Sequence, residues 1–202
     1  MYCKDTETST LLSYFHDVPL DLDKISDTIN FVCEIPRMTR AKMEVRTDLS
    51  WTPIMQDVTK TNKLRYYDEE IPWNYGMIPQ TYEDPGHRWP AIKGLPGDGD
   101  PLDVIEISKR RCPMGSITKV RILGALALID EGEVDWKIIA IRETSDMVSI
   151  DPEELDRIRE WFRSYKKVPN TYGLKGACIS VKDATSVIEL ANKLYTDKYS
   201  KK

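Results

Sequence analysis

Acidic side chains crowd into one short segment, GDGDPLD at residues 97–103, which places three carboxylates within six positions. The glycine and proline residues beside them force a tight, irregular backbone, so the segment is expected to be a turn. Three like charges at this spacing repel one another unless a cation neutralises them. The segment therefore predicts either a metal site or a solvated acidic turn, and alone it does not decide between the two.

A calcium-binding EF-hand loop is the first alternative for these carboxylates. Such a loop needs a third oxygen ligand two residues after Asp100, then a glycine, and a glutamate farther along the chain. Leu102, Asp103 and Lys109 occupy those positions in this sequence. The spacing therefore argues against an EF-hand.

A second acidic segment, DEGEVDWK at residues 130–137, lies between two apolar runs and predicts a β-hairpin. The turn would bring Asp130 near Asp135. The two-residue period of a strand would then put Asp135 and Lys137 on one face and Trp136 on the other. For a single hairpin, a polar face turned to solvent is the more ordinary explanation.

The combination of these features predicts a site for magnesium or manganese and an anionic substrate. In AKMEV, at residues 41–45, strand alternation also puts Lys42 and Glu44 on one side. Two histidines and four cysteines without a CxxC pair disfavour zinc. Carboxylates alone suit magnesium or manganese. Lysine and arginine side chains left over beside such metals favour a phosphate-bearing substrate.

Six short runs rich in branched or aromatic residues predict a small closed or packed sheet. They are residues 29–35, 41–45, 63–67, 103–107, 118–129 and 134–141. The stretch 80–101, rich in proline and glycine, is expected to be a loop without regular elements. Two helices are expected in the last third of the chain. One begins at its N-cap Asp151 and buries Leu155, Ile158, Phe162 and Tyr165, and the other begins near Asp183 and buries Val187, Leu190, Ala191 and Leu194.

Composition predicts a single domain across residues 1–202, because 202 residues with 41% hydrophobic content are enough to bury one core. A net charge of −4 argues against nucleic acid as a partner. No apolar run approaches the length that crosses a bilayer, so no membrane association is expected. The start of the chain has the character of neither a signal peptide nor a transit peptide. A cytoplasmic location with reduced thiols is therefore expected.

The chain resembles the family I soluble inorganic pyrophosphatases, and their eukaryotic branch more than the shorter bacterial one. The matching segments are EIPR at 34–37, AKME at 41–44, KLR at 63–65, NYG at 74–76, DGDPLD at 98–103, DEGEVDWK at 130–137, and WFR at 161–163 followed by Tyr165 and Lys166. The resemblance runs from about Phe15 to the C-terminal helix. Residues 1–12 fall outside it and are expected to form a flexible N-terminal arm.

The resemblance implies a mainly β fold with flanking helices (α+β), in which an OB-type barrel of five strands carries the site in its mouth. It implies several Mg²⁺ ions, for which Mn²⁺ can substitute, at Asp98, Asp103, Asp135, Asp130 and Glu44. It implies pyrophosphate contacts from Lys42, Arg65, Tyr75, Lys137, Tyr165 and Lys166. Asp100 would be the general base, and Glu34 would support the edge of the site.

The implied reaction is hydrolysis of magnesium pyrophosphate to two phosphates by direct attack of a metal-bridged hydroxide, without a covalent intermediate. Two positions depart from the family. Ile71 stands four residues before Tyr75, where a second tyrosine is usual, so one hydroxyl contact is missing or comes from another residue. Met38 stands where many eukaryotic relatives have an aromatic residue in the dimer interface. A homodimer is still expected, with a weakened dimer or a monomer as the alternative.

The sequence fits three other functions less well than an enzyme of this kind. A non-catalytic metal-binding interaction module on the same fold would have lost charged site positions, yet every acidic position that could be matched is filled. A nucleotide pyrophosphohydrolase of the Nudix type would carry an RExxEE helix, which the sequence lacks. A nucleic-acid-binding OB domain would need basic and aromatic residues on its open face, whereas the residues expected on that face of this protein are acidic.

Overall fold

Five strands form a closed ring in the computed structural model, which describes residues 1–199. They are β3 (Thr28–Ile35), β8 (Asn74–Met77), β11 (Asp103–Glu106), β12 (Ile117–Asp130) and β13 (Glu133–Arg142). Their order is β13-β11-β8-β3-β12, and β12 pairs back with β13 to close the ring. All the pairings are antiparallel except the one between β11 and β13. The prediction of an OB-type five-stranded barrel with added strands and helices is confirmed.

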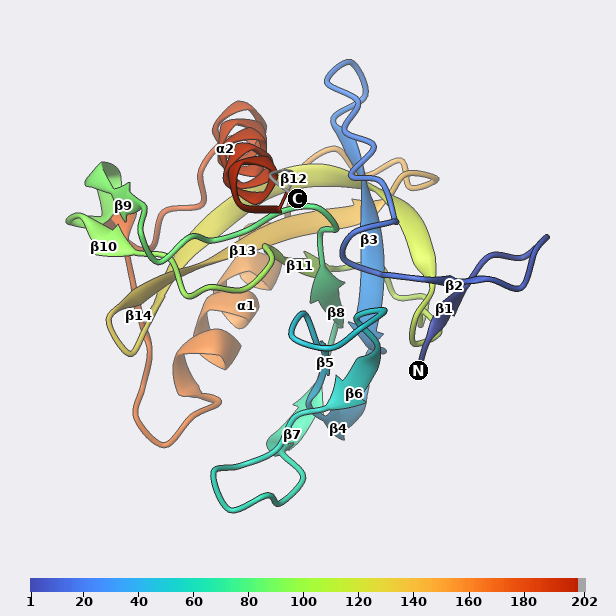
Figure 1. Cartoon of the computed structure of the whole chain (residues 1–202). Helices are drawn as coiled ribbons and strands as arrows, with labels where there is room; N and C mark the ends of the chain where they lie inside the picture. Colours follow the sequence, from blue (N-terminus) through green and yellow to red (C-terminus); the bar gives the residue numbers. More distant parts are fainter. Residues whose placement is uncertain (200–202) are drawn as a thin grey trace.

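Two helices cover opposite faces of the long curved strands β12 and β13 (Figure 1). Trp136 and Ile138 of β13 belong to the apolar cluster beneath α2 (Val181–Tyr199). Ile139 and Ile141, which point the other way, belong to the cluster beneath α1 (Pro152–Ser164). Odd-numbered side chains of β13 therefore face α1, and Asp135 and Lys137 share this parity.

Both predicted helices are present close to their expected starts. Asp151 is the N-cap of α1, and its carboxylate accepts a hydrogen bond from the Glu153 backbone N–H at 2.8 Å. Ile158 and Phe162 are buried, as the helical spacing predicted. In α2, Ser180 and Asp183 hydrogen-bond to each other at the first turn. The buried stripe of α2 includes the predicted Val187 and Ala191, with Leu190 and Leu194 half-buried.

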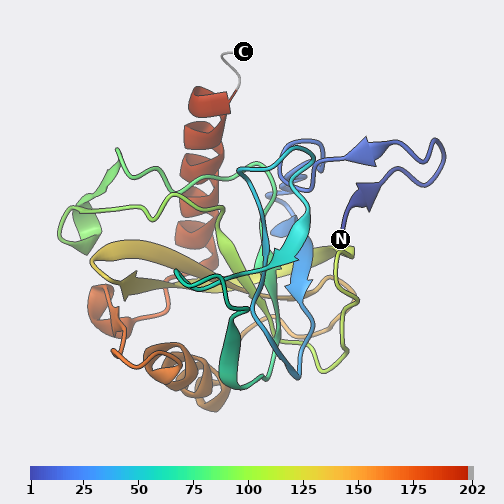
Figure 2. The same cartoon turned by 60° about the horizontal axis from the view of Figure 1, so that its bottom comes forward.

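A separate small lobe, built from two strand pairs, hangs below the barrel in Figure 1. β4 (Thr39–Ala41) pairs with β7 (Tyr66–Ile71), and β5 (Met43–Val45) pairs with β6 (Ile54–Gln56). The predicted strand 41–45 is thus divided at Lys42, and the predicted run 63–67 becomes strand only from Tyr66 onward. Figure 2 shows the same lobe from a direction in which α2 stands upright to its left.

Several short elements were not expected from the sequence. The stretch 80–101 was wrongly predicted to lack regular structure, because it contains β9 (Arg88–Trp89), a 3-10 turn (Pro90–Ile92) and β10 (Leu95–Pro96). The sequence of β8, NYGM, contains two poor strand formers. Gly76 is needed in β8 because a Cβ there would lie 2.0 Å from the Val32 carbonyl oxygen of β3. β14 (Thr171–Tyr172) and the 3-10 turn Leu174–Gly176 extend the edge at β12.

Residues 1–12, expected to form a flexible arm, contain the hairpin of β1 (Cys3–Lys4) and β2 (Leu11–Leu12). Cys3 is buried in an apolar cluster with Tyr14 and Phe15. The terminal ammonium of Met1 donates a hydrogen bond to the Ile54 carbonyl at 2.5 Å. The start of this hairpin is therefore anchored to the lobe, while its flexibility in solution stays a prediction.

Replacement of the N-cap, Asp151→Ala, is expected to lower the free energy of unfolding by about 1 kcal/mol, because one orphan N–H at the start of α1 loses its acceptor. Urea denaturation measures the change. Asp146→Ala, at an exposed aspartate outside the helix, is the matched control and is expected to change stability by less than about 0.5 kcal/mol. Equal stability of the two variants would show that the cap does not stabilise α1.

Candidate active site

The residues predicted to do chemistry all line one cavity of about 820 Å³. The cavity lies between the barrel, the lobe and the C-terminal end of α1. The thirteen are Glu34, Lys42, Glu44, Arg65, Tyr75, Asp98, Asp100, Asp103, Asp130, Asp135, Lys137, Tyr165 and Lys166. The structure thus brings together residues that the sequence separates by up to 132 positions.

The loop that carries Asp98 and Asp100 is held by its packing on Glu83. A Cβ at Gly97 would lie 2.4 Å from the Glu83 carbonyl oxygen, so only glycine allows this close approach. Gly99 has a φ of 91°, which other residues rarely adopt, and its N–H donates to the same carbonyl at 2.8 Å. The Glu83 N–H in turn donates to the Asp100 carbonyl at 2.9 Å. Backbone contacts therefore set the direction of both carboxylates.

Strand register places Asp103, Asp135 and Lys137 beside one another. Asp103 of β11 lies opposite Lys137 of the parallel strand β13, and Asp135 precedes Lys137 by two residues on the same face. The Lys137 ammonium lies 2.6 and 2.5 Å from the two carboxylate oxygens of Asp135 and donates to the Tyr75 hydroxyl at 2.9 Å. It also contacts the Asp103 carboxylate, which accepts a hydrogen bond from Tyr75. The predicted hairpin and its two faces are confirmed, with Trp136 in the apolar cluster beneath α2.

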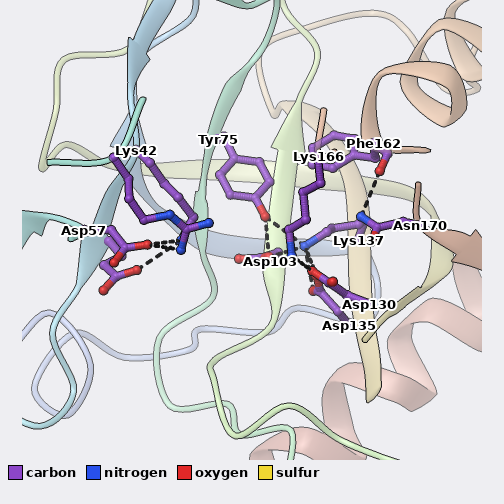
Figure 3. Close-up of polar contacts among 12 residues, drawn as sticks. Lys42, Asp57, Tyr75, Asp103, Asp130, Asp135, Lys137, Phe162, Lys166 and Asn170 are labelled. Carbon is purple, nitrogen blue, oxygen red and sulfur yellow. Dashed lines mark hydrogen bonds and ion pairs between the residues drawn. The ribbon is translucent and has the colours of Figure 1, made fainter. Parts of the chain in front are cut away.

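A second wall comes from the end of α1 (Figure 3). Tyr165 is the C-cap of the helix, and its ring stacks on Trp161 with centroids 5.2 Å apart. The ammonium of Lys166 forms an ion pair with Asp130 at the end of β12. The Asn170 amide donates to the Phe162 carbonyl at 3.0 Å, which ties the segment after α1 back to the helix.

The lobe supplies a third wall, in which three segments meet at a closed ring of backbone hydrogen bonds. The Lys42 N–H donates to the Arg65 carbonyl, the Arg65 N–H to the Asp57 carbonyl, and the Asp57 N–H to the Lys42 carbonyl, at 3.1, 2.8 and 2.9 Å. The Asp57 carboxylate then lies 2.7 Å from the Lys42 ammonium and 2.5 Å from the Arg65 guanidinium. Lys42 also approaches Glu44 at 3.2 Å. Asp57 thereby holds both cations together on the side of the site opposite Asp135 (Figure 3).

Asp57 and Glu83 were both missed by sequence analysis. Glu83 is fully buried, and its Oε1 accepts a hydrogen bond from the Trp136 N–H at 3.1 Å. Its only sequence signal was its place in the proline- and glycine-rich loop, and no spacing linked it to Asp98. Asp57 lies between two short strands without any local acidic pattern. Only the contacts between distant segments reveal the two residues.

Burial and mutual repulsion perturb the acidic groups of the cavity. Burial, followed by the charges of Asp135 and Asp100, raises the pKa of Asp98 to about 9. Burial within the cavity, followed by Asp103 and Glu44, raises the pKa of Asp100 to about 6. Burial also raises the pKa of Asp135 to about 7 even though Lys137 opposes this shift. The cavity therefore lacks the positive charge needed to ionise all of its carboxylates.

Two further acidic groups at the site have raised pKa values: Glu34, which lines the cavity, and Glu83, which is buried beside Asp98 and Asp135. Burial, with Asp98 and Asp135 as further causes, raises the pKa of Glu83 well above its usual range. Burial and Asp103 raise the pKa of Glu34, whose carboxylate accepts a hydrogen bond from the Val45 N–H at 2.6 Å. Burial therefore shifts both carboxyl groups toward the protonated form in the metal-free protein.

These groups fit a divalent metal ion. Carboxylate oxygens of Glu83, Asp98 and Asp135 lie within 4.8 Å of one another. Among residues 1–199, Glu83 Oε2 and Asp130 Oδ1 are buried without any hydrogen-bond partner. Such orphaned oxygens are costly unless a cation or water occupies the space that they face. An oxygen-only set of this kind suits a hard divalent cation.

Ile71 does not face the cavity. Its side chain is fully buried in the apolar cluster that contains Trp73 and Phe162, beneath α1. Position 71 therefore contributes packing in this protein and offers no hydroxyl to a ligand.

The chain is similar to known inorganic pyrophosphatases along most of its length. The family model described as inorganic pyrophosphatase matches residues 31–196. Soluble inorganic pyrophosphatase 6, chloroplastic, of Arabidopsis thaliana is 44% identical over 195 residues, which cover 90% of this chain and 64% of that protein. This chain therefore spans less than two thirds of that relative.

Solved structures show the same similarity. The type I inorganic pyrophosphatase from Toxoplasma gondii matches with a TM-score of 0.88 and 40% identity, over 94% of this chain and 89% of that one. The N-terminal domain truncated vacuolar soluble pyrophosphatase of Trypanosoma cruzi, solved in complex with PPi, matches with a TM-score of 0.87 and 34% identity, over 97% and 83% of the two chains.

Affinity for a divalent cation is expected to fall as the pH is lowered. Asp98, with a pKa of about 9 in the metal-free protein, holds a proton at neutral pH and must release it to bind a metal. One released proton weakens binding by up to about tenfold per pH unit below that pKa. Calorimetric titration with Mg²⁺ at pH 8 and pH 6, each in two buffers of different ionisation enthalpy, measures affinity and proton release together. Equal affinities without proton release would contradict the proposed ligand role of Asp98.

Proposed function

Because this chain belongs to the inorganic pyrophosphatase family, we propose that it hydrolyses inorganic pyrophosphate to two phosphate ions with the help of divalent metal ions. The observation that carries this proposal is that one cavity gathers a cluster of aspartates together with cationic side chains from three parts of the fold. Asp98, Asp100 and Asp103 line the cavity. Lys42 and Arg65 approach from the lobe and Lys166 from the end of α1. A substrate that carries several negative charges and is bound together with metal ions fits such a cavity.

We propose magnesium as the metal, with manganese able to substitute. Asp98, Asp103 and Asp135 would hold the central ion, and Asp130 and Glu44 would help to hold the ions that arrive with the substrate. We add Glu83 to these proposed ligands, because its Oε2 is buried and unpaired within the described residues and lies near Asp98 and Asp135. When bound, the metal neutralises the substrate and lowers the pKa of water toward neutrality.

Asp100 is proposed as the general base. It lines the cavity, and with a pKa of about 6 its carboxylate is ionised at neutral pH yet basic enough to accept a proton from water. The Asp98 carboxylate accepts a hydrogen bond from the Asp100 backbone N–H at 2.9 Å, which fixes this turn. In this proposal Asp100 would orient a water molecule and take its proton as that water attacks phosphorus.

The cationic and hydroxyl groups around the cavity are proposed to bind the substrate phosphates. Lys42 and Arg65 would bind one phosphate from the lobe, and Lys137 and Lys166 would approach from β13 and the end of α1. Tyr75 and Tyr165 would add hydroxyl groups, and Glu34 would support the edge of the site. These charges stabilise the phosphate that leaves, so hydrolysis needs no covalent intermediate with the protein.

Phosphate release from pyrophosphate is the test of this function. Purified protein is expected to release phosphate rapidly with magnesium, hardly at all from ATP, and not at all with excess chelator. Asp100→Asn is expected to fold and bind magnesium while losing about a hundred- to ten-thousand-fold in turnover, because the general base is removed. Asp68→Asn, at an exposed aspartate outside the cavity, is the control and is expected to match the wild type.

Two outcomes would contradict parts of this proposal. Near wild-type turnover by Asp100→Asn would remove Asp100 from the mechanism. If folded wild-type protein released no phosphate from pyrophosphate or ATP with magnesium or manganese, the enzymatic function would be contradicted. A metal-binding interaction module on the same barrel would then be favoured.

A homodimer is proposed for the assembled state. Met38, at the turn between β3 and β4, has 51% of its surface exposed, so burial against a second copy would remove apolar area from water. Light scattering is expected to give a mass of twice that of the chain, and Met38→Glu is expected to shift it toward the monomer. A monomeric wild type at all concentrations would contradict the proposal.

The cytoplasm is proposed as the compartment. None of the four cysteines, all of which lie in the described part of the chain, forms a disulfide. In residues 1–199 no helix is both long and apolar enough to cross a membrane. A fluorescent fusion of the full-length protein that accumulates in an organelle would contradict this location.

A further inference from the structure

Tyr67 presents a fixed hydroxyl group to the proposed pyrophosphate site, although no sequence pattern singled it out. Strand β7 alternates at this point, so Tyr66 has 58% of its surface exposed whereas Tyr67 has only 6%. Tyr67 lines the same cavity as Lys42, Arg65 and Asp103, and Tyr66 does not. Arg65, one of the proposed phosphate ligands, precedes it by two residues. The two adjacent tyrosines therefore point to opposite environments.

Aromatic packing holds the Tyr67 ring in place. Its edge meets Trp161 with centroids 5.1 Å apart and an interplanar angle of 73°. It meets Tyr165 in the same manner, at 5.7 Å and 75°. Trp161 and Tyr165 are themselves stacked at the end of α1. On the strand, the Tyr67 carbonyl accepts a hydrogen bond from the Arg40 guanidinium at 3.0 Å. A ring packed against two other rings costs little additional entropy when its hydroxyl binds a ligand.

The hydroxyl of Tyr67 is also uncommitted. No hydrogen bond from it exists within residues 1–199, and it is not among the sealed, unsatisfied polar atoms, so it faces the cavity. The hydroxyl of Tyr75, by contrast, already binds Asp103 and Lys137. Tyr67 thus offers a donor that a ligand does not have to take away from another partner.

The surroundings keep this hydroxyl protonated. Burial raises the pKa of Tyr67, and the neighbouring Lys42 lowers it by less. A neutral O–H donor adds a contact to an anionic oxygen without changing the charge balance set by the lysines and carboxylates. Such a donor is useful in a cavity whose charged groups already pair closely with one another.

We propose that Tyr67 is a substrate-binding residue, whose hydroxyl donates a hydrogen bond to a phosphate oxygen held by Lys42 and Arg65. This inference rests on the proposed pyrophosphatase function. The bond is charge-assisted, because the acceptor oxygen is anionic, and bonds of this type are the stronger ones in proteins.

The test is Tyr67→Phe, which removes the hydroxyl and keeps the ring packed against Trp161 and Tyr165. We expect its kcat/KM for magnesium pyrophosphate to fall about tenfold or more. We expect a similar loss of affinity for methylenediphosphonate, a non-hydrolysable analogue, measured by calorimetry with magnesium present. Mg²⁺ affinity without the analogue and the thermal midpoint should stay unchanged. Tyr66→Phe, on the outward face of the same strand, is the matched control and should equal the wild type in every measurement.

The outcomes separate this inference from the function on which it rests. An active wild type together with Tyr67→Phe of unchanged kcat/KM and unchanged analogue affinity would overturn the role of Tyr67 alone. A loss of activity accompanied by an equal loss of Mg²⁺ affinity or of thermal stability would show a structural role and would overturn it as well. A wild type that neither releases phosphate nor binds the analogue would overturn the function and this inference together.

Discussion

Repulsion among carboxylates in a single cavity is the constraint around which this protein is built. Ten acidic and six basic residues line the cavity, so negative charge is in excess there. Lys137, 2% exposed, offsets part of it from within, beside Asp103 and Asp135. Asp98 has no such cation, and its pKa rises to about 9 as a result of burial and its acidic neighbours. The metal-free cavity thus binds protons where the proposed enzyme binds metal.

This repulsion weakens the metal-free fold in a pH-dependent way. The folded protein keeps a proton on Asp98 up to about pH 9, whereas an unfolded aspartate loses it near pH 4. Because the folded state binds more protons in this window, stability without metal falls as the pH rises through it. A divalent cation in place of those protons reverses the penalty, since any ligand that binds only the folded state stabilises it. The carboxylates that destabilise the metal-free fold therefore favour the binding of a divalent cation.

Such a cavity persists because each of its walls is fixed by contacts other than those between charged groups. The loop of Asp98 and Asp100 is locked onto the Glu83 backbone through glycine. The segments of the lobe that carry Lys42 and Arg65 are joined to Asp57 by the ring of backbone hydrogen bonds. Aromatic packing at the end of α1 holds the third wall. Preorganised walls of this kind can stabilise developing charge without reorganising during the reaction.

Local patterns in the sequence were sufficient for much of this protein. The spacing of Asp98, Asp100 and Asp103, the hairpin that pairs Asp135 with Lys137, and the cap at Asp151 all depend on neighbours within a few residues. Strand alternation and helical periodicity predicted these features, and the family resemblance predicted the five-stranded barrel. β8 was not predicted, because Gly76 is required by the close approach of β3 and not by any local strand propensity. The hairpin at residues 3–12 likewise depends on burial of Cys3 against a distant part of the chain.

Asp57, Glu83 and Tyr67 belong to the opposite class. Each is an ordinary residue in its own segment and acquires a place in the site through partners in other segments, such as Lys42 for Asp57 and Trp136 for Glu83. Burial, unlike spacing, is a property of the assembled chain: Tyr66 and Tyr67 are the same residue type side by side, and only packing distinguishes the one in the cavity from the one in water. Residue types and local periodicity thus indicate which chemistry a chain can perform. Long-range packing decides which further side chains belong to the site, because the site is assembled from segments that have no contact until the chain folds.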